Sequence, residues 1–230
     1  MNDTIEEAYA RLWLALEPLA PRKQLLAYVA FARRFEPLLT NDSCLQLLDT
    51  AERVADGDAD LRALSALKNE YFQRFHGQPA ELDNKNADYI ACELGFFAPR
   101  RLRELSGQID TDRFRTAAGG MVHTMLWWLR LMRVGEHQRE WFENELVSFL
   151  ATCHDLGGKP TTEFNPRWVS TKAQQLATGM YESRDFGPMP VLADALEDAG
   201  CADADVLGHC RGPGPHVRGC WVVDLSLGKE

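Results

Sequence analysis

Apolar side chains recur at intervals of three and four residues along nearly the whole chain, which is the spacing of one face of an α-helix. Alternation of the kind found in β-strands is nearly absent. The pattern therefore predicts an all-α protein, an irregular multi-helix bundle with short carboxy-terminal helices docked on it. The apolar stripes lie within residues 5–16, 21–39, 45–55, 61–75, 79–94, 114–132, 141–150, 171–181 and 191–199.

Residues typical of helix ends and turns separate these stripes. Gly57 is expected to end the third helix, and Ser170 and Asp203 are expected to cap later ones. Residues 157–170 (GGKPTTEFNPRWVS) carry no helical stripe and are predicted to form a loop strapped across the helices, with Phe164 and Trp168 as anchors. The last helix is expected from Val217 to Leu227, although Trp221 to Val223 is also compatible with a strand.

The chain of 230 residues can build one sizeable core or two small ones. No period of 20–50 residues recurs, so a repeat architecture is not indicated. We predict one α-helical domain, 1–230, with a possible subdivision into a helical bundle at 1–156 and a carboxy-terminal region at 164–230.

Composition and charge narrow the classes of partner. Hydrophobic residues make up 45% and charged residues 26% of the chain, as in an ordinary soluble domain. The net charge of −9 repels phosphate backbones and anionic lipids, so neither nucleic acid nor a membrane is the expected partner. The weakly charged run 117–129 is too short for a bilayer span, and the acidic start does not look like a secretion signal. A cytoplasmic protein with reduced cysteines is expected.

Candidate metal ligands crowd into the carboxy-terminal tail. Thiols and imidazoles are the ligands that zinc prefers. Against a zinc site, no C-x2-C pair occurs, adjacent residues 209 and 210 cannot easily reach one ion, and buried cysteines often pack as small hydrophobes. We predict interior packing and no cofactor, with a structural zinc site or a metal-supported enzyme as alternatives. The candidate ligands are Cys201, His209, Cys210, His216 and Cys220.

Two further groups are candidate binding residues. Arg211, His216 and Arg218 surround a Gly-Pro-Gly-Pro turn and could hold a phosphate or a carboxylate. Ion pairs from the two arginines to nearby acidic residues are the favoured interpretation, with Asp194, Glu197, Asp198 and Asp224 as the possible partners.

The adjacent Trp127 and Trp128 project about 100° apart on a helix, so one of them could form an exposed apolar patch for a protein partner.

No catalytic residue is predicted. Cys153, His154 and Asp155 are contiguous, but adjacent helical residues point apart, whereas catalytic groups meet in space. The chain contains neither a G-x-S-x-G elbow nor an H-E-x-x-H helix. These observations favour a non-catalytic helical module for protein interaction or regulation.

Two long segments resemble a known family. Residues 168–201 (WVSTKAQQLATGMYESRDFGPMPVLADALEDAGC) and 209–225 (HCRGPGPHVRGCWVVDL) resemble the carboxy-terminal signature of a large paralogous family of planctomycete bacterial proteins. Residues 21–57 and the FNPRW motif are similar to other parts of that family. The resemblance implies a bacterial origin, but it implies no activity, cofactor or catalytic residue. Relatives often carry cysteines where this chain has residues 28–32, YVAFA.

Overall fold

A computed structural model gives the fold of the protein. It describes residues 10–12, 14–34, 36–38, 42–75 and 138–229, and all structural statements below concern these residues. The stripes expected at 79–94 and 114–132, together with Trp127 and Trp128, lie outside them. The all-α prediction is confirmed, because the described residues form helices and no strand. The chain divides into two compact units, Met1–Leu150 and Ala151–Glu230, which are described separately.

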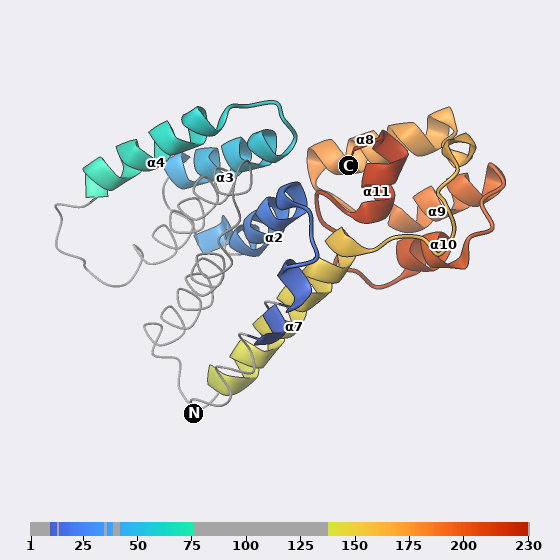
Figure 1. Ribbon diagram of the computed structural model, residues 1–230, viewed down its shortest axis with the longest axis horizontal. Coiled ribbons are helices and arrows are strands. Elements are labelled where there is room, and N and C mark those ends of the chain that lie inside the picture. The colour runs from blue at the N-terminus through green and yellow to red at the C-terminus, as the bar shows by residue number, and fades with distance from the viewer. Residues whose placement is uncertain (1–9, 13, 35, 39–41, 76–137, 230) are drawn as a thin grey trace. The chain divides into compact units, whose positions relative to one another are not determined.

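In the first unit, helices that follow one another along the chain are in contact. Helix α2 contacts α3, and α3 contacts α4, as Figure 1 shows. Gly57 ends α3 with a φ of +78°, as its position in the sequence predicts. Within this unit Phe31 packs edge-on against Phe149, with ring centroids 5.6 Å apart. The helices are α2 (Pro21–Arg33), η1 (Glu36–Leu38), α3 (Asp42–Ala55), α4 (Leu61–Phe75) and the first part of α7 (Gln138–Gly157).

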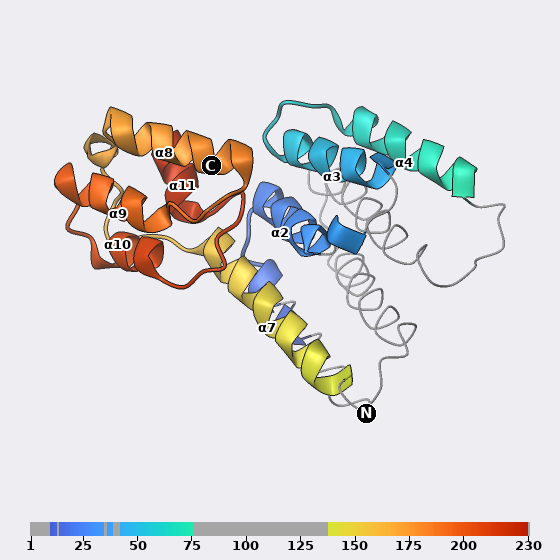
Figure 2. The same ribbon diagram turned by 180° about the vertical axis from the view of Figure 1, so that it is seen from behind.

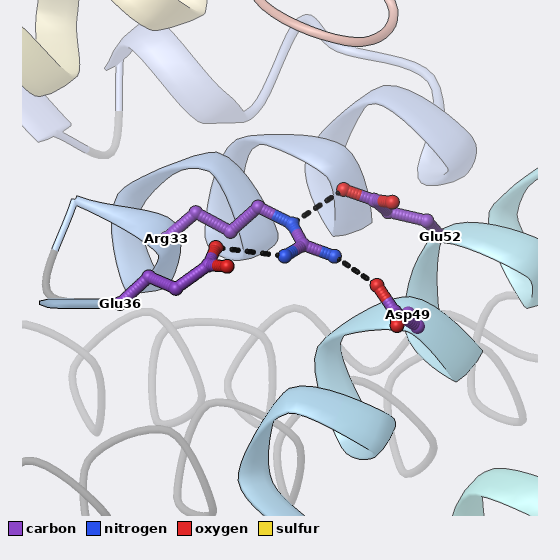
Figure 3. A network of polar contacts seen from close by, with 4 residues as sticks. All are labelled: Arg33, Glu36, Asp49 and Glu52. Carbon is purple, nitrogen blue, oxygen red and sulfur yellow. Dashed lines mark hydrogen bonds and ion pairs between the residues drawn. The ribbon is translucent and has the colours of Figure 1, made fainter. Parts of the chain in front are cut away.

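An ion-pair network joins the end of α2 to α3 in this unit. The guanidinium of Arg33 donates from Nε to Glu52 and from its two terminal nitrogens to Glu36 and Asp49, as Figure 3 shows. Glu52 is almost completely buried, whereas Glu36 and Asp49 are exposed. One cation therefore compensates a buried carboxylate and is shared with two surface carboxylates.

The second unit packs four helices around one apolar core. Helix α9 lies beside α8 and α10, and α11 lies against α8, as both views in Figures 1 and 2 show. The core is formed by apolar faces of all four helices and includes Met180, Leu192, Val206 and Val222. The helices are η2 (Pro166–Trp168), α8 (Thr171–Ser183), α9 (Met189–Asp198), α10 (Ala204–Arg211) and α11 (Trp221–Leu227).

Polar caps and the connecting loop of the second unit follow the sequence. The Ser170 hydroxyl accepts a hydrogen bond from Ala173 N at the start of α8, and the Asp203 carboxylate accepts from Asp205 N and Val206 N at the start of α10. Both predicted caps are confirmed. Most of 157–170 is a loop, in which Phe164 packs edge-on against Trp168 at 5.5 Å and both rings lie against the core. The strand alternative for Trp221 to Val223 is wrong, because these residues begin α11.

Candidate metal centre

Four potential metal ligands from separate parts of the second unit meet in space. Asp155 lies in the last turn of α7, and His209 lies in the last turn of α10. His216 is carried by the loop that follows α10, and Cys220 is the N-cap residue of α11. Their ligand atoms all lie within 4.8 Å of one another. The fold therefore brings together side chains that are up to 65 positions apart, from 155 to 220.

The loop between α10 and α11 has the backbone needed to return His216 to α7. Helix α10 ends at Gly212, and Gly214 has a φ of +77°, a conformation that side chains other than glycine rarely adopt. A Cβ at Gly214 would also lie 2.9 Å from His216 N. The Gly-Pro-Gly-Pro run thus directs the chain back so that His216 lies beside Asp155.

One nitrogen of each histidine lies close to the same carboxylate oxygen of Asp155. Asp155 Oδ1 lies 3.0 Å from His209 Nε2 and 2.8 Å from His216 Nδ1. His209 Nε2 is also 3.2 Å from Cys220 Sγ. The other carboxylate oxygen, Oδ2, accepts a hydrogen bond of 2.9 Å from Val217 N. This bond fixes the carboxylate so that Oδ1 alone is directed at the imidazoles.

The centre is withdrawn from solvent. Asp155 is 2% exposed and Cys220 is 0% exposed, while the side chains of His209 and His216 are 12% and 9% exposed. Burial opposes ionisation of Asp155, but the hydrogen bonds from His209, His216 and Val217 outweigh it and lower the pKa of the carboxyl. Burial, and then the Asp155 charge, raise the pKa of the Cys220 thiol well above its ordinary value.

A cysteine-based catalytic relay does not fit this geometry. In such a relay the imidazole contacts the thiol with one nitrogen and the orienting carboxylate with the other. Here Cys220 Sγ and Asp155 Oδ1 both lie at the same nitrogen, His209 Nε2. A nucleophilic thiol also needs access and a lowered pKa, whereas Cys220 is inaccessible and its pKa is raised. Convergence of lone-pair donors on one point is instead typical of a metal site.

Two other rings, those of His216 and Trp221, pack against His209. Its ring centroid lies 4.9 Å from that of His216 and 5.0 Å from that of Trp221. Trp221 is buried and belongs to the apolar core. His216 Nε2 is buried and has no hydrogen-bond partner in the part of the chain that the structure describes.

Three of the five predicted metal ligands lie together in the structure, and two do not. His209, His216 and Cys220 belong to the convergent group, whereas Cys201 and Cys210 do not. Both of those cysteines are buried free thiols. Desolvation raises the pKa of Cys210 to about 12, as expected of a thiol packed in an apolar interior.

The remaining ligand, Asp155, was not among the predicted site residues. In the sequence it stands out only as the last residue of the contiguous run Cys153, His154 and Asp155. The only signal in the sequence is a carboxylate at the end of a predicted helix, and nothing near it shows that it meets the Cys/His tail.

The candidate anion-binding arginines make other contacts. Arg211 is ion-paired with Asp194 and Glu197 on α9, with distances of 2.9 Å and 2.5 Å. The Arg218 guanidinium lies over the Tyr181 ring of α8, 4.4 Å from its centroid. These contacts agree with the favoured interpretation for Arg211, namely docking of α10 on α9, and they give Arg218 a partner that the sequence did not indicate.

Comparisons with protein-family models, with curated proteins and with solved structures found no match for this chain. The resemblance to the planctomycete family therefore stays a prediction. Within the described ranges, every helix is too short or too polar to cross a bilayer.

Proposed function

We propose that residues 151–230 form a structural zinc-binding domain, and that the chain is a non-catalytic helical module for protein interaction. The observation that carries this proposal is the meeting of Asp155, His209, His216 and Cys220, whose ligand atoms lie within 4.8 Å of one another. The three predicted ligands in this group are joined by a carboxylate from a different helix.

The chemistry of the donors supports zinc over other ions. One thiol, two imidazoles and one carboxylate are all ligand types that zinc accepts, and structural zinc sites have four protein ligands. The single thiol and the two imidazoles are poor ligands for magnesium or calcium, which prefer oxygen. Four protein ligands also leave no position for a substrate, which supports a structural rather than a catalytic centre.

The electrostatics of the pocket also support a bound cation. A buried carboxylate is costly unless a positive charge compensates it. Asp155 is contacted by two imidazoles and a backbone N–H, none of which carries a permanent charge. A divalent ion would supply that charge and would also keep the Cys220 sulfur as a thiolate, reversing the effect of burial on its pKa.

A structural metal centre has no open position for a substrate, so binding would take place at the surface of the folded domain. We therefore propose a protein as the class of partner. A metal-supported enzyme is the less favoured function, because the four donors would complete the coordination of the ion.

The test compares two buried thiols of the same unit. Protein purified under reducing conditions without added chelator is analysed for zinc by mass spectrometry, as wild type, Cys220→Ala and Cys210→Ala. Both thiols are 0% exposed, so the two substitutions remove similar packing. We expect stoichiometric zinc in the wild type and in Cys210→Ala, and loss of zinc in Cys220→Ala.

Equal zinc content in the two variants, or a wild type that takes up no zinc on reconstitution, would overturn the proposal. Asp155→Asn with His154→Gln as its control gives a second comparison. His154 is the exposed neighbour of Asp155 on the same helical turn, so its replacement should leave the zinc content unchanged.

A further inference from the structure

Trp221 lies next to three parts of the candidate metal centre: Cys220, His209 and the end of α7. It directly follows Cys220 at the start of α11, and it is 5% exposed. Its ring centroid lies 5.0 Å from that of His209, with the ring planes inclined by 51°. On another side the indole lies so close to Gly158 that a Cβ at that position would overlap Nε1 and Cδ1. Trp221 therefore contacts both α10 and the end of α7 at the points from which ligands project.

No protein group among the described residues bonds to the second ring nitrogen of His209. A metal-bound histidine usually donates its second ring nitrogen to a carboxylate, a carbonyl or water, and that bond fixes the plane of the ring. Among the described residues, His209 makes its polar contacts to Asp155 and Cys220 through Nε2 alone. The ring itself packs against two neighbours, the rings of His216 and Trp221, with centroids 4.9 Å and 5.0 Å away.

We propose that Trp221 is the positioning residue of the zinc centre, which holds the His209 imidazole in the plane required for Nε2 to bind the ion. This inference rests on the proposed function. The bare backbone of Gly158 lets the indole approach α7 closely enough to lie against His209. Packing thereby replaces the hydrogen-bonded partner that commonly orients such a ligand.

The test measures the affinity and the geometry of the centre in the full chain. Zinc affinity is measured by competition with a chromophoric chelator, and the coordination geometry is measured from the visible absorption spectrum of the cobalt(II)-substituted protein. The variants are Trp221→Leu, which removes the aromatic ring, and Trp221→Phe, which keeps one. Trp168→Leu is the matched control, because Trp168 packs against the same core but has Phe164 edge-on as its aromatic neighbour.

We expect Trp221→Leu to bind zinc about 10-fold to 100-fold more weakly, the usual effect of removing a residue that orients a ligand. Its cobalt spectrum should shift, because His209 can then tilt. Trp221→Phe should recover most of the affinity and the wild-type spectrum, and Trp168→Leu should retain both. A role in core packing alone would lower thermal stability in both leucine variants without changing the cobalt spectrum.

Gly158→Ala gives a second test, in which no ligand residue and no aromatic residue is replaced. The added methyl group would push the indole away from α7, so we expect weaker zinc binding and the same direction of spectral shift as in Trp221→Leu. Wild-type affinity and spectrum in Trp221→Leu or in Gly158→Ala would overturn the positioning role while leaving the proposed function intact. A wild type that binds neither zinc nor cobalt would overturn both.

Discussion

The Arg33 network of the first unit and the Asp155 group of the second show two ways to place a carboxylate in a helical interior. At Arg33 the chain supplies the compensating cation, and the guanidinium directs separate nitrogens to Glu36, Asp49 and Glu52 (Figure 3). At Asp155 two imidazole nitrogens approach a single carboxylate oxygen, and a thiol lies beside one of them.

The two clusters differ in whether their polar contacts diverge from one group or converge on one point. Divergence is typical of a salt-bridge network, and convergence is typical of a set of metal ligands. Contacts at Arg33 diverge from a permanent charge, and each one satisfies a different acceptor. Contacts at Asp155 converge on one point, and no arginine or lysine side chain contacts that carboxylate among the described residues. The comparison teaches that a buried anion surrounded by further lone-pair donors has the arrangement expected of a cation-binding site, whereas a buried anion on a guanidinium already has its cation.

The largest expected difference between the two clusters is their response to chelation. Wild-type protein with free zinc at about 1,000 times its dissociation constant should lose about 4 kcal/mol of unfolding free energy when a chelator removes the ion. Asp155→Asn should be as unstable as chelated wild type and should not respond to chelator. Glu52→Gln, the matching change in the first unit, should keep the full response. Urea unfolding followed by circular dichroism measures the stability of the wild type and both variants with and without chelator. A wild type insensitive to chelator would contradict the assignment of the Asp155 group as a metal site.

A smaller effect is expected from removing the cation at the first cluster. Arg33→Met leaves Glu52 buried without its partner, and breaking a pair of this kind costs about 3 kcal/mol. The loss should be the same with and without chelator, because no metal takes part. Arg34→Met is the control, since Arg34 pairs with Glu145 but is more exposed, and it should cost less. A chelator-dependent loss in Arg33→Met would contradict the assignment of the two clusters to different classes.

The smallest expected effect is at Asp203, a polar group of the second unit that lies outside the ligand set. Asp203→Ala removes the N-cap of α10 and should cost about 1 kcal/mol, independently of zinc. The hydrogen bond from Thr162, followed by those from Val206 N and Asp205 N, lowers the pKa of this carboxyl. Its contribution is therefore present above the ordinary pKa of aspartate and is lost as the pH falls through the lowered value. Denaturation at neutral and acidic pH should show a gap between wild type and Asp203→Ala that narrows in acid.

Local features of the described fold could be predicted because their causes are local. Ser170 and Asp203 cap helices through hydrogen bonds to N–H groups two or three residues away. The last helix shows where such reasoning ends. It was expected from Val217 but begins at Trp221, because Gly219 has a φ of +93°, which no α-helix contains. The segment before this break instead contacts α7, where Val217 N donates to Asp155, a residue 62 positions earlier.

The candidate centre was only partly predictable for the same reason. His209, His216 and Cys220 were among the predicted ligands because residue type alone marks them. Cys210 was included although it is adjacent to His209 on α10, where side chains point about 100° apart. Asp155 was missed because nothing near it in sequence shows that α7 ends beside the tail. The contact depends on how the apolar faces of α8 to α11 pack, which no short motif encodes.

The hydrogen bond from Val217 to Asp155 Oδ2 has a consequence for which ions the proposed centre should bind. This hydrogen bond engages Oδ2 of Asp155, the one carboxylate among the four candidate ligands. Only Oδ1 then remains for an ion. Calcium takes about six to eight oxygen ligands, and magnesium retains much of its water shell. The proposed centre should therefore bind neither calcium nor magnesium in place of zinc, and loss of zinc alone should lower the stability of the domain.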